Sequence, residues 1–178
     1  MILFQSIELK NFVIFEDVCL EFSNDPEKPL TIVRGENETG KTTLMRGLQW
    51  ILFDDAAFPN LEFGHPFRPL WAEKQEGSVI TEGTLYFTVS DPETNTPATW
   101  KVIRSATSGY SEDDGRYSTF DRQLSVFHEV RGEWTILKTH NFDALVKRFF
   151  PVETRGFYFV DADEADEFVG GKESQFST

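Results

Sequence analysis

The sequence predicts an α/β fold in which a strand–loop–helix unit is joined to an antiparallel β layer. Residues 30–35 (LTIVRG) form a short β-branched run that ends on glycine. Residues 41–53 (KTTLMRGLQWILF) follow the next loop and place apolar side chains at helical spacing. Residues 82–138 then contain runs with alternating apolar side chains, separated by turn residues, which is typical of antiparallel hairpins.

Length and composition fit a single domain over residues 1–178, because 39% of the residues are hydrophobic and a substantial core can form. Cys19 is the only cysteine, which excludes an internal disulfide. The apolar start, MILFQSIELKNF, is too short and too polar for a signal peptide or a membrane span. We therefore expect a cytoplasmic protein with no membrane partner. The net charge of −13 repels DNA at long range, so DNA binding would require the full assembly.

Strands are predicted before the loop at residues 2–9, 18–22 and 30–35. Leu20 and Phe22 are expected to face the core. Gly47 lies within the predicted helix 41–53, where glycine costs about 1 kcal/mol relative to alanine. No element is predicted for residues 54–78, which are rich in proline and aromatic side chains.

Two hairpins are predicted in the middle of the chain, pairing residues 82–91 with 98–106 and residues 120–130 with 133–138. Residues 107–118 (TSGYSEDDGRYS) are predicted to be an exposed loop between them. A helix is then expected at residues 141–150, ending before Pro151, and an apolar strand at residues 156–160.

The loop after residue 34 matches the phosphate-binding pattern G-x-x-x-x-G-K-[ST] through Gly35, Gly40, Lys41 and Thr42. Glycines permit a tight turn that directs backbone N–H groups at phosphates, and a helix N-terminus adds partial positive charge. Lys41 is expected to contact the β- and γ-phosphates, and the Thr42 hydroxyl to ligate Mg²⁺. The pattern arises by chance in roughly one chain of this length per hundred.

The other residues of the loop, Asn37, Glu38, Thr39 and Thr43, are expected to line the same nucleotide site. GTPases carry D-x-x-G and N-K-x-D motifs, and the sequence contains neither. A compact nucleotide kinase would carry a basic lid instead of a long β-rich region. A nucleotide held with Mg²⁺ is therefore the expected ligand.

The segments MILFQSIELKNFVIFEDVCLEF and LTIVRGENETGKTTLMRGLQWILF resemble the N-terminal ATPase lobe of the SMC-like, ABC-type ATPases. That group includes the structural-maintenance-of-chromosomes proteins, double-strand-break repair ATPases and the DNA sulfur-modification protein DndD. Residues 9–12 match the group's L-K-N-F turn, and Asn37 stands at its usual loop asparagine. The segment FYFVDADE is similar to F-F-F-D-G-E of the DndD branch, with Ala162 in place of glycine.

This resemblance implies a P-loop NTPase with a RecA-like core and an added antiparallel β layer. It also implies hydrolysis of ATP upon head-to-head dimerisation with a second protomer, in DNA modification, repair or defence. The group's L-S-G-G-type signature and coiled-coil heptads are absent from these 178 residues. We therefore expect an N-terminal lobe that is a fragment of a longer chain, with its own C-terminal ATPase lobe as partner and little turnover alone.

Asp161 ends the apolar run of residues 156–160 and admits three interpretations. The resemblance implies a magnesium-side residue, at the position usually held by a Q-loop glutamine. A Walker B aspartate would instead make the chain a complete small P-loop NTPase, and an N-cap of a short helix would be structural. Asp163 is a candidate for positioning water. A non-catalytic, nucleotide-gated interaction module is the further functional alternative.

Overall fold

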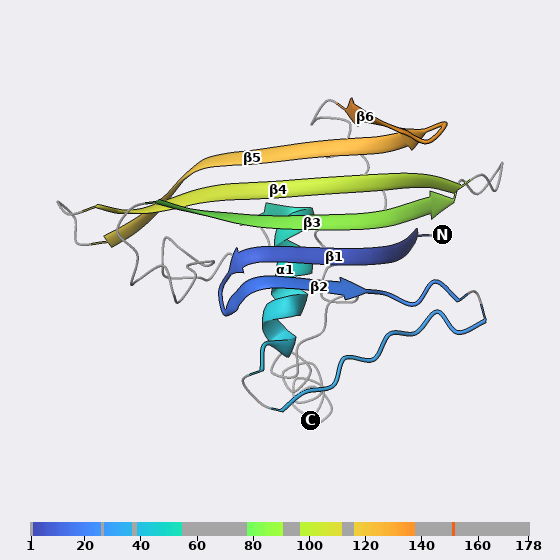
Figure 1. The fold of residues 1–178 in the computed structure, drawn as a ribbon, viewed down its shortest axis with the longest axis horizontal. Coiled ribbons are helices and arrows are strands. Elements are labelled where there is room, and N and C mark those ends of the chain that lie inside the picture. The colour runs from blue at the N-terminus through green and yellow to red at the C-terminus, as the bar shows by residue number, and fades with distance from the viewer. Residues whose placement is uncertain are drawn as a thin grey trace, which may run out of the picture.

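The computed structural model describes residues 2–25, 27–36, 39–54, 78–90, 97–111, 116–137 and Pro151. These residues form a six-stranded antiparallel sheet and one helix that crosses its strands (Figure 1). The strand order is β2-β1-β3-β4-β5-β6. The elements are β1 (Ile2–Phe12), β2 (Phe15–Glu21), α1 (Lys41–Phe53), β3 (Ser78–Ser90), β4 (Pro97–Ser111), β5 (Arg116–Val130) and β6 (Glu133–Leu137).

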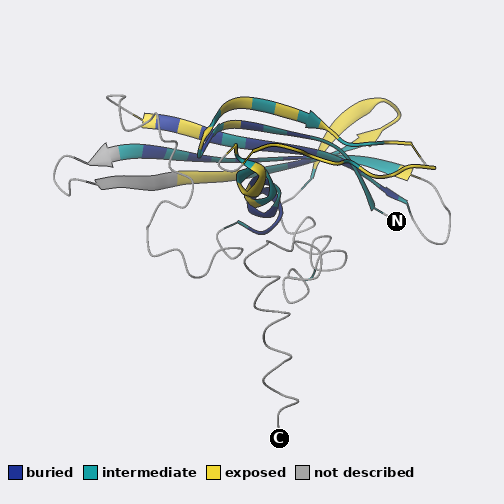
Figure 2. Ribbon diagram, turned by 90° about the horizontal axis from the view of Figure 1, so that it is seen from below, coloured by how far each residue is buried: buried dark blue, intermediate teal, exposed yellow. Residues whose placement is uncertain are grey.

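The core lies between α1 and the sheet face that it covers (Figure 2). Alternate residues of the strands point toward the helix, as the two-residue period of a strand requires. Phe12 of β1 and Trp50 of α1 pack with ring centroids 5.5 Å apart, and each is no more than 1% exposed. The other fully buried side chains of this layer include Ile7, Leu9, Ile51, Leu85, Phe87 and Val102.

Two glycines let α1 lie close to the sheet. A Cβ atom on Gly47 would fall 2.6 Å from Cδ1 of Leu9, and one on Gly83 would fall 2.7 Å from Cγ1 of Ile51. Leu9 is fully buried and also lies near the Gly83 position. Gly47 therefore has a packing role that outweighs its low helix propensity.

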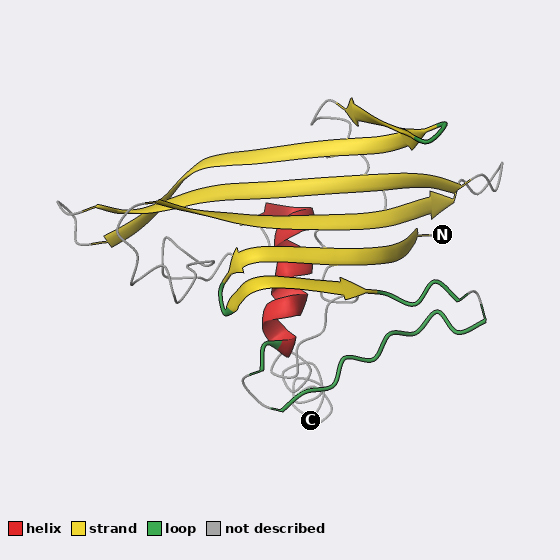
Figure 3. Cartoon of the chain, in the orientation of Figure 1, coloured by secondary structure: helices red, strands yellow, loops and turns green. Residues whose placement is uncertain are grey.

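The predicted helix 41–53 is confirmed at both ends, and the two hairpins are confirmed as the pairs β3–β4 and β5–β6. Leu20 and Phe22 pack against the core as expected. The predicted loop at residues 107–118 is wrong for the described residues 107–111 and 116–118, because Thr107 to Ser111 pair with Arg116 to Phe120 and lengthen β4 and β5 (Figure 3). Serine, threonine and tyrosine are compatible with strands where a neighbouring strand satisfies the backbone.

The predicted strand at residues 30–35 is also wrong, since this segment has no regular secondary structure. Leu30, Ile32 and Val33 are 69%, 63% and 44% exposed. An apolar run becomes a strand only when a neighbouring strand satisfies its N–H and C=O groups. No described residue forms such a ladder with this segment.

The predicted helix at residues 141–150 and strand at residues 156–160 lie outside the described residues. Within the described part of the chain, α1 has 13 residues, and no helix is long and apolar enough to cross a bilayer.

Candidate nucleotide-binding site

The phosphate-loop motif forms a turn that leads directly into α1. The hydroxyl of Thr39 donates a hydrogen bond to the carbonyl of Glu36 at 2.8 Å. The Lys41 ammonium donates to the carbonyl of Gly35 at 2.7 Å and to that of Glu36. The lysine side chain therefore folds back over the loop that precedes it, at the position where the motif predicts phosphate oxygens.

Both glycines of the motif leave little room for a side chain. A Cβ atom on Gly35 would fall 2.5 Å from the hydroxyl oxygen of Thr39. Gly40 has φ of +100°, in the left-handed region that side chains disfavour, and its Cβ atom would meet Ile14 at 2.5 Å and Phe15 at 2.7 Å. A side chain at position 35 would displace the Thr39 hydroxyl, and one at position 40 would meet both the positive φ and the β1–β2 turn.

Gly40 is the N-cap of α1, and its carbonyl accepts the first helical hydrogen bond from the amide of Leu44 at 2.8 Å. Among the described residues no side chain caps this helix end, and the first turn contains no acidic residue. The first N–H groups of a helix have no partner within the helix and carry partial positive charge. The start of α1 thus offers donors and positive potential to an anion.

Thr42 and Thr43 occupy the first turn of the helix, where Thr42 is exposed and Thr43 is half-buried. The exposed hydroxyl of Thr42 suits Mg²⁺, a cation that typically takes one or two protein oxygens and completes its shell with phosphate and water. The described residues contain no group of three or more His, Cys, Asp or Glu side chains able to hold a metal by themselves. Among the described residues, Thr42 is the candidate to hold a metal together with the phosphates.

The structure brings together six of the predicted site residues, namely Gly35, Thr39, Gly40, Lys41, Thr42 and Thr43. The other four, Asn37, Glu38, Asp161 and Asp163, lie outside the described residues. The three interpretations of Asp161 therefore stay open, and its place at the metal stays a prediction.

The β1–β2 turn contributes to the site in a way that the sequence did not predict. Ile14 and Phe15 fill the space beside Gly40, so this hairpin forms one wall of the helix start. The turn immediately follows the L-K-N-F segment, whose only signal in the sequence is its family resemblance. Nothing in the local pattern of residues 13–15 predicts contact with a loop that lies 25 residues away.

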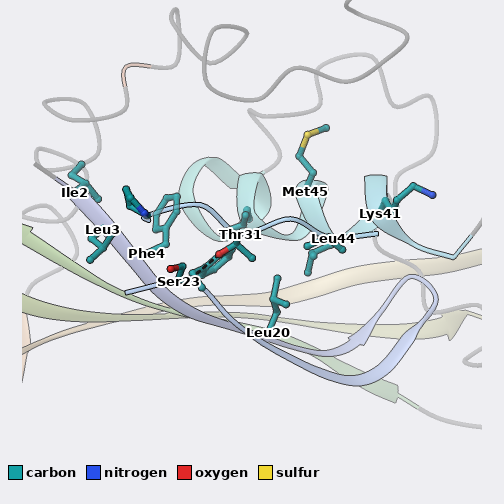
Figure 4. Close-up of a pocket in the computed structure, with 13 residues that line it drawn as sticks. Ile2, Leu3, Phe4, Leu20, Ser23, Thr31, Lys41, Leu44 and Met45 are labelled. Atoms are coloured by element: carbon teal, nitrogen blue, oxygen red, sulfur yellow. Dashed lines mark hydrogen bonds between the residues drawn. The ribbon is translucent and has the colours of Figure 1, made fainter. Parts of the chain in front are cut away.

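A cavity of about 430 Å³ lies beside the loop, between β1, β2 and α1 (Figure 4). Leu3 and Phe4 line it from β1, Leu20 from β2, and Leu44 and Met45 from α1. Lys41 lies at its edge, with its ammonium directed away from the apolar side chains. An apolar lining is unsuited to phosphates, so the loop is the better candidate for an anion site than this cavity.

Comparisons with known proteins agree with this geometry. The AAA domain family matches residues 6–153 of the chain, which include the loop, α1 and nearly the whole sheet. No curated protein matches the sequence significantly. One solved chain, from work on ATP-driven dimerisation and DNA-stimulated activation of SMC ATPases, aligns over 94% of this chain and 90% of its own length. Its TM-score is 0.54 at 14% sequence identity, a likeness of fold, and the fold is that of a P-loop NTPase. On the extent of the family match, the chain belongs to the AAA domain family.

Proposed function

We propose that this chain is the ATP-binding N-terminal lobe of an SMC-like ATPase, with Mg–ATP held between Gly35 and Thr43. The proposal rests on the geometry at the start of α1. The N-cap residue Gly40 has a left-handed conformation, and the Lys41 ammonium folds back to bind the Gly35 carbonyl of the preceding loop. The family match and the SMC-like fold support the nucleotide class.

In this proposal the backbone N–H groups at the start of α1 donate to phosphate oxygens. Lys41 exchanges its bonds to the carbonyls of Gly35 and Glu36 for bonds to the β- and γ-phosphates. Thr42 would supply a hydroxyl to hold Mg²⁺, and the metal would neutralise negative charge on the phosphates. Asn37, Glu38, Thr39 and Thr43 complete the cradle.

Asp161 is proposed to lie beside Mg²⁺, and Asp163 is proposed to position the attacking water. Both roles follow from the similarity of this segment to that of the DndD branch. Hydrolysis would then depend on a C-terminal lobe and on a second protomer, which supply groups across the γ-phosphate. Exposed apolar side chains in the segment that precedes the loop support this dependence, because a partner lobe would have apolar surface to cover at Leu30 and Ile32, which are 69% and 63% exposed. Any DNA contact would come through that assembly, since the lobe is strongly acidic.

Titration calorimetry with Mg–ATP tests the binding role. We expect wild-type protein to bind and Lys41→Ala to bind roughly 100-fold more weakly or not at all, because charge-assisted bonds to two phosphates are lost. Lys10→Ala, at an exposed lysine of β1, is the matched control and should bind like wild type. Equal affinity of wild type and Lys41→Ala would refute the phosphate-loop role.

Turnover distinguishes the catalytic alternatives. Little hydrolysis by the 178-residue chain, increased by a C-terminal lobe, supports the SMC-like proposal. Fast hydrolysis by the monomeric chain would favour a complete small NTPase with Asp161 as its Walker B residue. Tight binding without hydrolysis, even with the second lobe present, would favour a nucleotide-gated interaction module.

A further inference from the structure

We infer that Asn11 is a positioning residue for the phosphate loop, acting through the β1–β2 turn on Gly40. This inference rests on the proposed nucleotide-binding function. It assigns this role to Asn11 alone among residues 9–12, and Asn11 acts through the turn without touching a ligand.

Asn11 ties the β1–β2 turn to β3 through two hydrogen bonds. Its side-chain amide donates to the carbonyl of Ile80 at 2.8 Å, and its own carbonyl accepts from the hydroxyl of Thr81 at 2.9 Å. Thr81 is 1% exposed, so the second bond anchors the turn to the buried part of the sheet. The partners are about 70 residues apart in the chain, which makes this a tertiary anchor and not a local turn bond.

The backbone of the turn requires this anchor. Asn11 has φ of +51° and Val13 has φ of +51°, and both values lie in the left-handed region. Asparagine enters that region more readily than most residues, whereas the β-branched Val13 is strained there. Such strain persists only where the surroundings hold the backbone in place. The two bonds to β3 add to the restraint that the β1–β3 and β1–β2 ladders provide up to this turn.

The anchored β1–β2 turn also limits the position of Gly40. Ile14 and Phe15 lie so close to Gly40 that no Cβ atom fits between them and its backbone. The Gly40 carbonyl accepts the first hydrogen bond of α1 from Leu44. A series of contacts therefore links β3, through Asn11 and the β1–β2 turn, to the backbone at the start of α1. The N–H groups of this backbone are the ones proposed to bind the phosphates.

A site that is held in its binding geometry before the ligand arrives loses less conformational entropy on binding. Removing the Asn11 anchor should let the turn move and let Gly40 sample other conformations. We expect a nucleotide affinity about 3- to 10-fold weaker, comparable to the net effect of one or two hydrogen bonds. The sheet itself keeps its ladders and should stay folded.

The test uses Asn11→Asp and Thr81→Val, each measured for thermal midpoint, for Mg–ATP affinity by calorimetry, and for hydrogen exchange without nucleotide. Asn11→Asp keeps the size and the tolerance of positive φ but lacks the amide donor to Ile80. Thr81→Val removes the hydrogen bond to the Asn11 carbonyl at nearly constant side-chain shape. If one of the two variants fails to fold, the other variant decides the test. Lys10→Ala, next to Asn11 on an exposed position, is the control.

If Asn11 positions the loop, both variants should bind Mg–ATP more weakly than wild type. The amide hydrogen of Leu44, which donates to the Gly40 carbonyl, should also exchange faster. Lowered thermal midpoints with wild-type affinity and wild-type Leu44 exchange would overturn the inference and leave Asn11 with a structural role only. Failure of wild type to bind Mg–ATP overturns the proposed function separately, and the Leu44 exchange then decides whether Asn11 holds the helix start.

Discussion

Arg104 of β4 reaches the C-terminal end of α1, where its Nη1 atom lies 2.8 Å from Oδ2 of Asp54. Its Nε atom donates to the carbonyl of Ile51 at 3.1 Å, so the same side chain satisfies a helix-end carbonyl and the C-cap residue. The Arg104 side chain is only 10% exposed. The phosphate-loop helix is therefore fastened to the sheet at its far end as well as at its start.

Arg104→Met should lower the free energy of unfolding by about 2–3 kcal/mol, because the helix-end carbonyl and Asp54 lose a buried partner. Arg122 is the control: its Nη1 atom lies 3.4 Å from Asp54 and its side chain is 38% exposed. Arg122→Met should cost under about 1 kcal/mol, as exposed ion pairs do. Denaturant titration of both variants measures the difference, and equal losses would contradict the buried role of Arg104.

Gly47→Ala should destabilise the protein, although helix propensity alone predicts a gain of about 1 kcal/mol. The added Cβ atom would fall 2.6 Å from Leu9 Cδ1, and Leu9 has no exposed surface into which it can move. We expect a net loss of about 1–2 kcal/mol in denaturant titration. Leu9→Val removes part of the clash, so the double variant should lose less than the sum of the single variants. A stabilised Gly47→Ala would show that α1 does not pack this closely on the sheet.

Gly40→Ala should weaken nucleotide binding and lower stability by about 1–3 kcal/mol, since it combines a positive φ with a clash against Ile14 and Phe15. Gly132 provides a matched control, because its φ is +83° and no atom of the described residues lies within 4 Å of the position that an alanine methyl would take. Gly132→Ala should show only the backbone cost and bind Mg–ATP like wild type. Equal effects of the two substitutions on affinity would argue against the Gly40 turn as the phosphate cradle.

Cys19 should react slowly with iodoacetamide at neutral pH and faster at alkaline pH. Desolvation raises the pKa of its thiol, and the carboxylates of Glu8, Glu21 and Asp17 raise it further. A raised pKa leaves less reactive thiolate at a given pH, so the midpoint of the rate profile should lie at higher pH than that of a free cysteine. Glu8→Gln, which changes the residue opposite Cys19 in the sheet, should move this midpoint to lower pH, whereas Glu27→Gln should not. A profile identical to that of free cysteine would contradict this electrostatic explanation.

Much of the geometry of the candidate site was predictable because it depends on local interactions. The spacing of Gly35, Gly40 and Lys41 predicts the turn, and the helical period predicts α1 to the residue. The anchor from Asn11 to Ile80 and Thr81 could not be predicted, because it joins segments that the sequence alone does not bring together. Short-range patterns carry no information about such pairing.

The two errors in secondary structure have the same origin. Residues 30–35 have a strand-like composition, but no described strand pairs with them, so their apolar side chains stay exposed. Residues 107–111 have a loop-like composition, but they pair with β5 and become strand. In both segments the availability of a neighbouring strand outweighs the intrinsic preference of the residues.

A crystal structure with Mg²⁺ and a non-hydrolysable ATP analogue would show directly whether the loop before α1 holds the nucleotide. We predict phosphate oxygens on the backbone N–H groups at the start of α1, Mg²⁺ on the Thr42 hydroxyl, and Lys41 moved from the Gly35 carbonyl to the phosphates. A nucleotide seated in the apolar cavity or elsewhere, with Lys41 still bonded to Gly35, would contradict the proposed function.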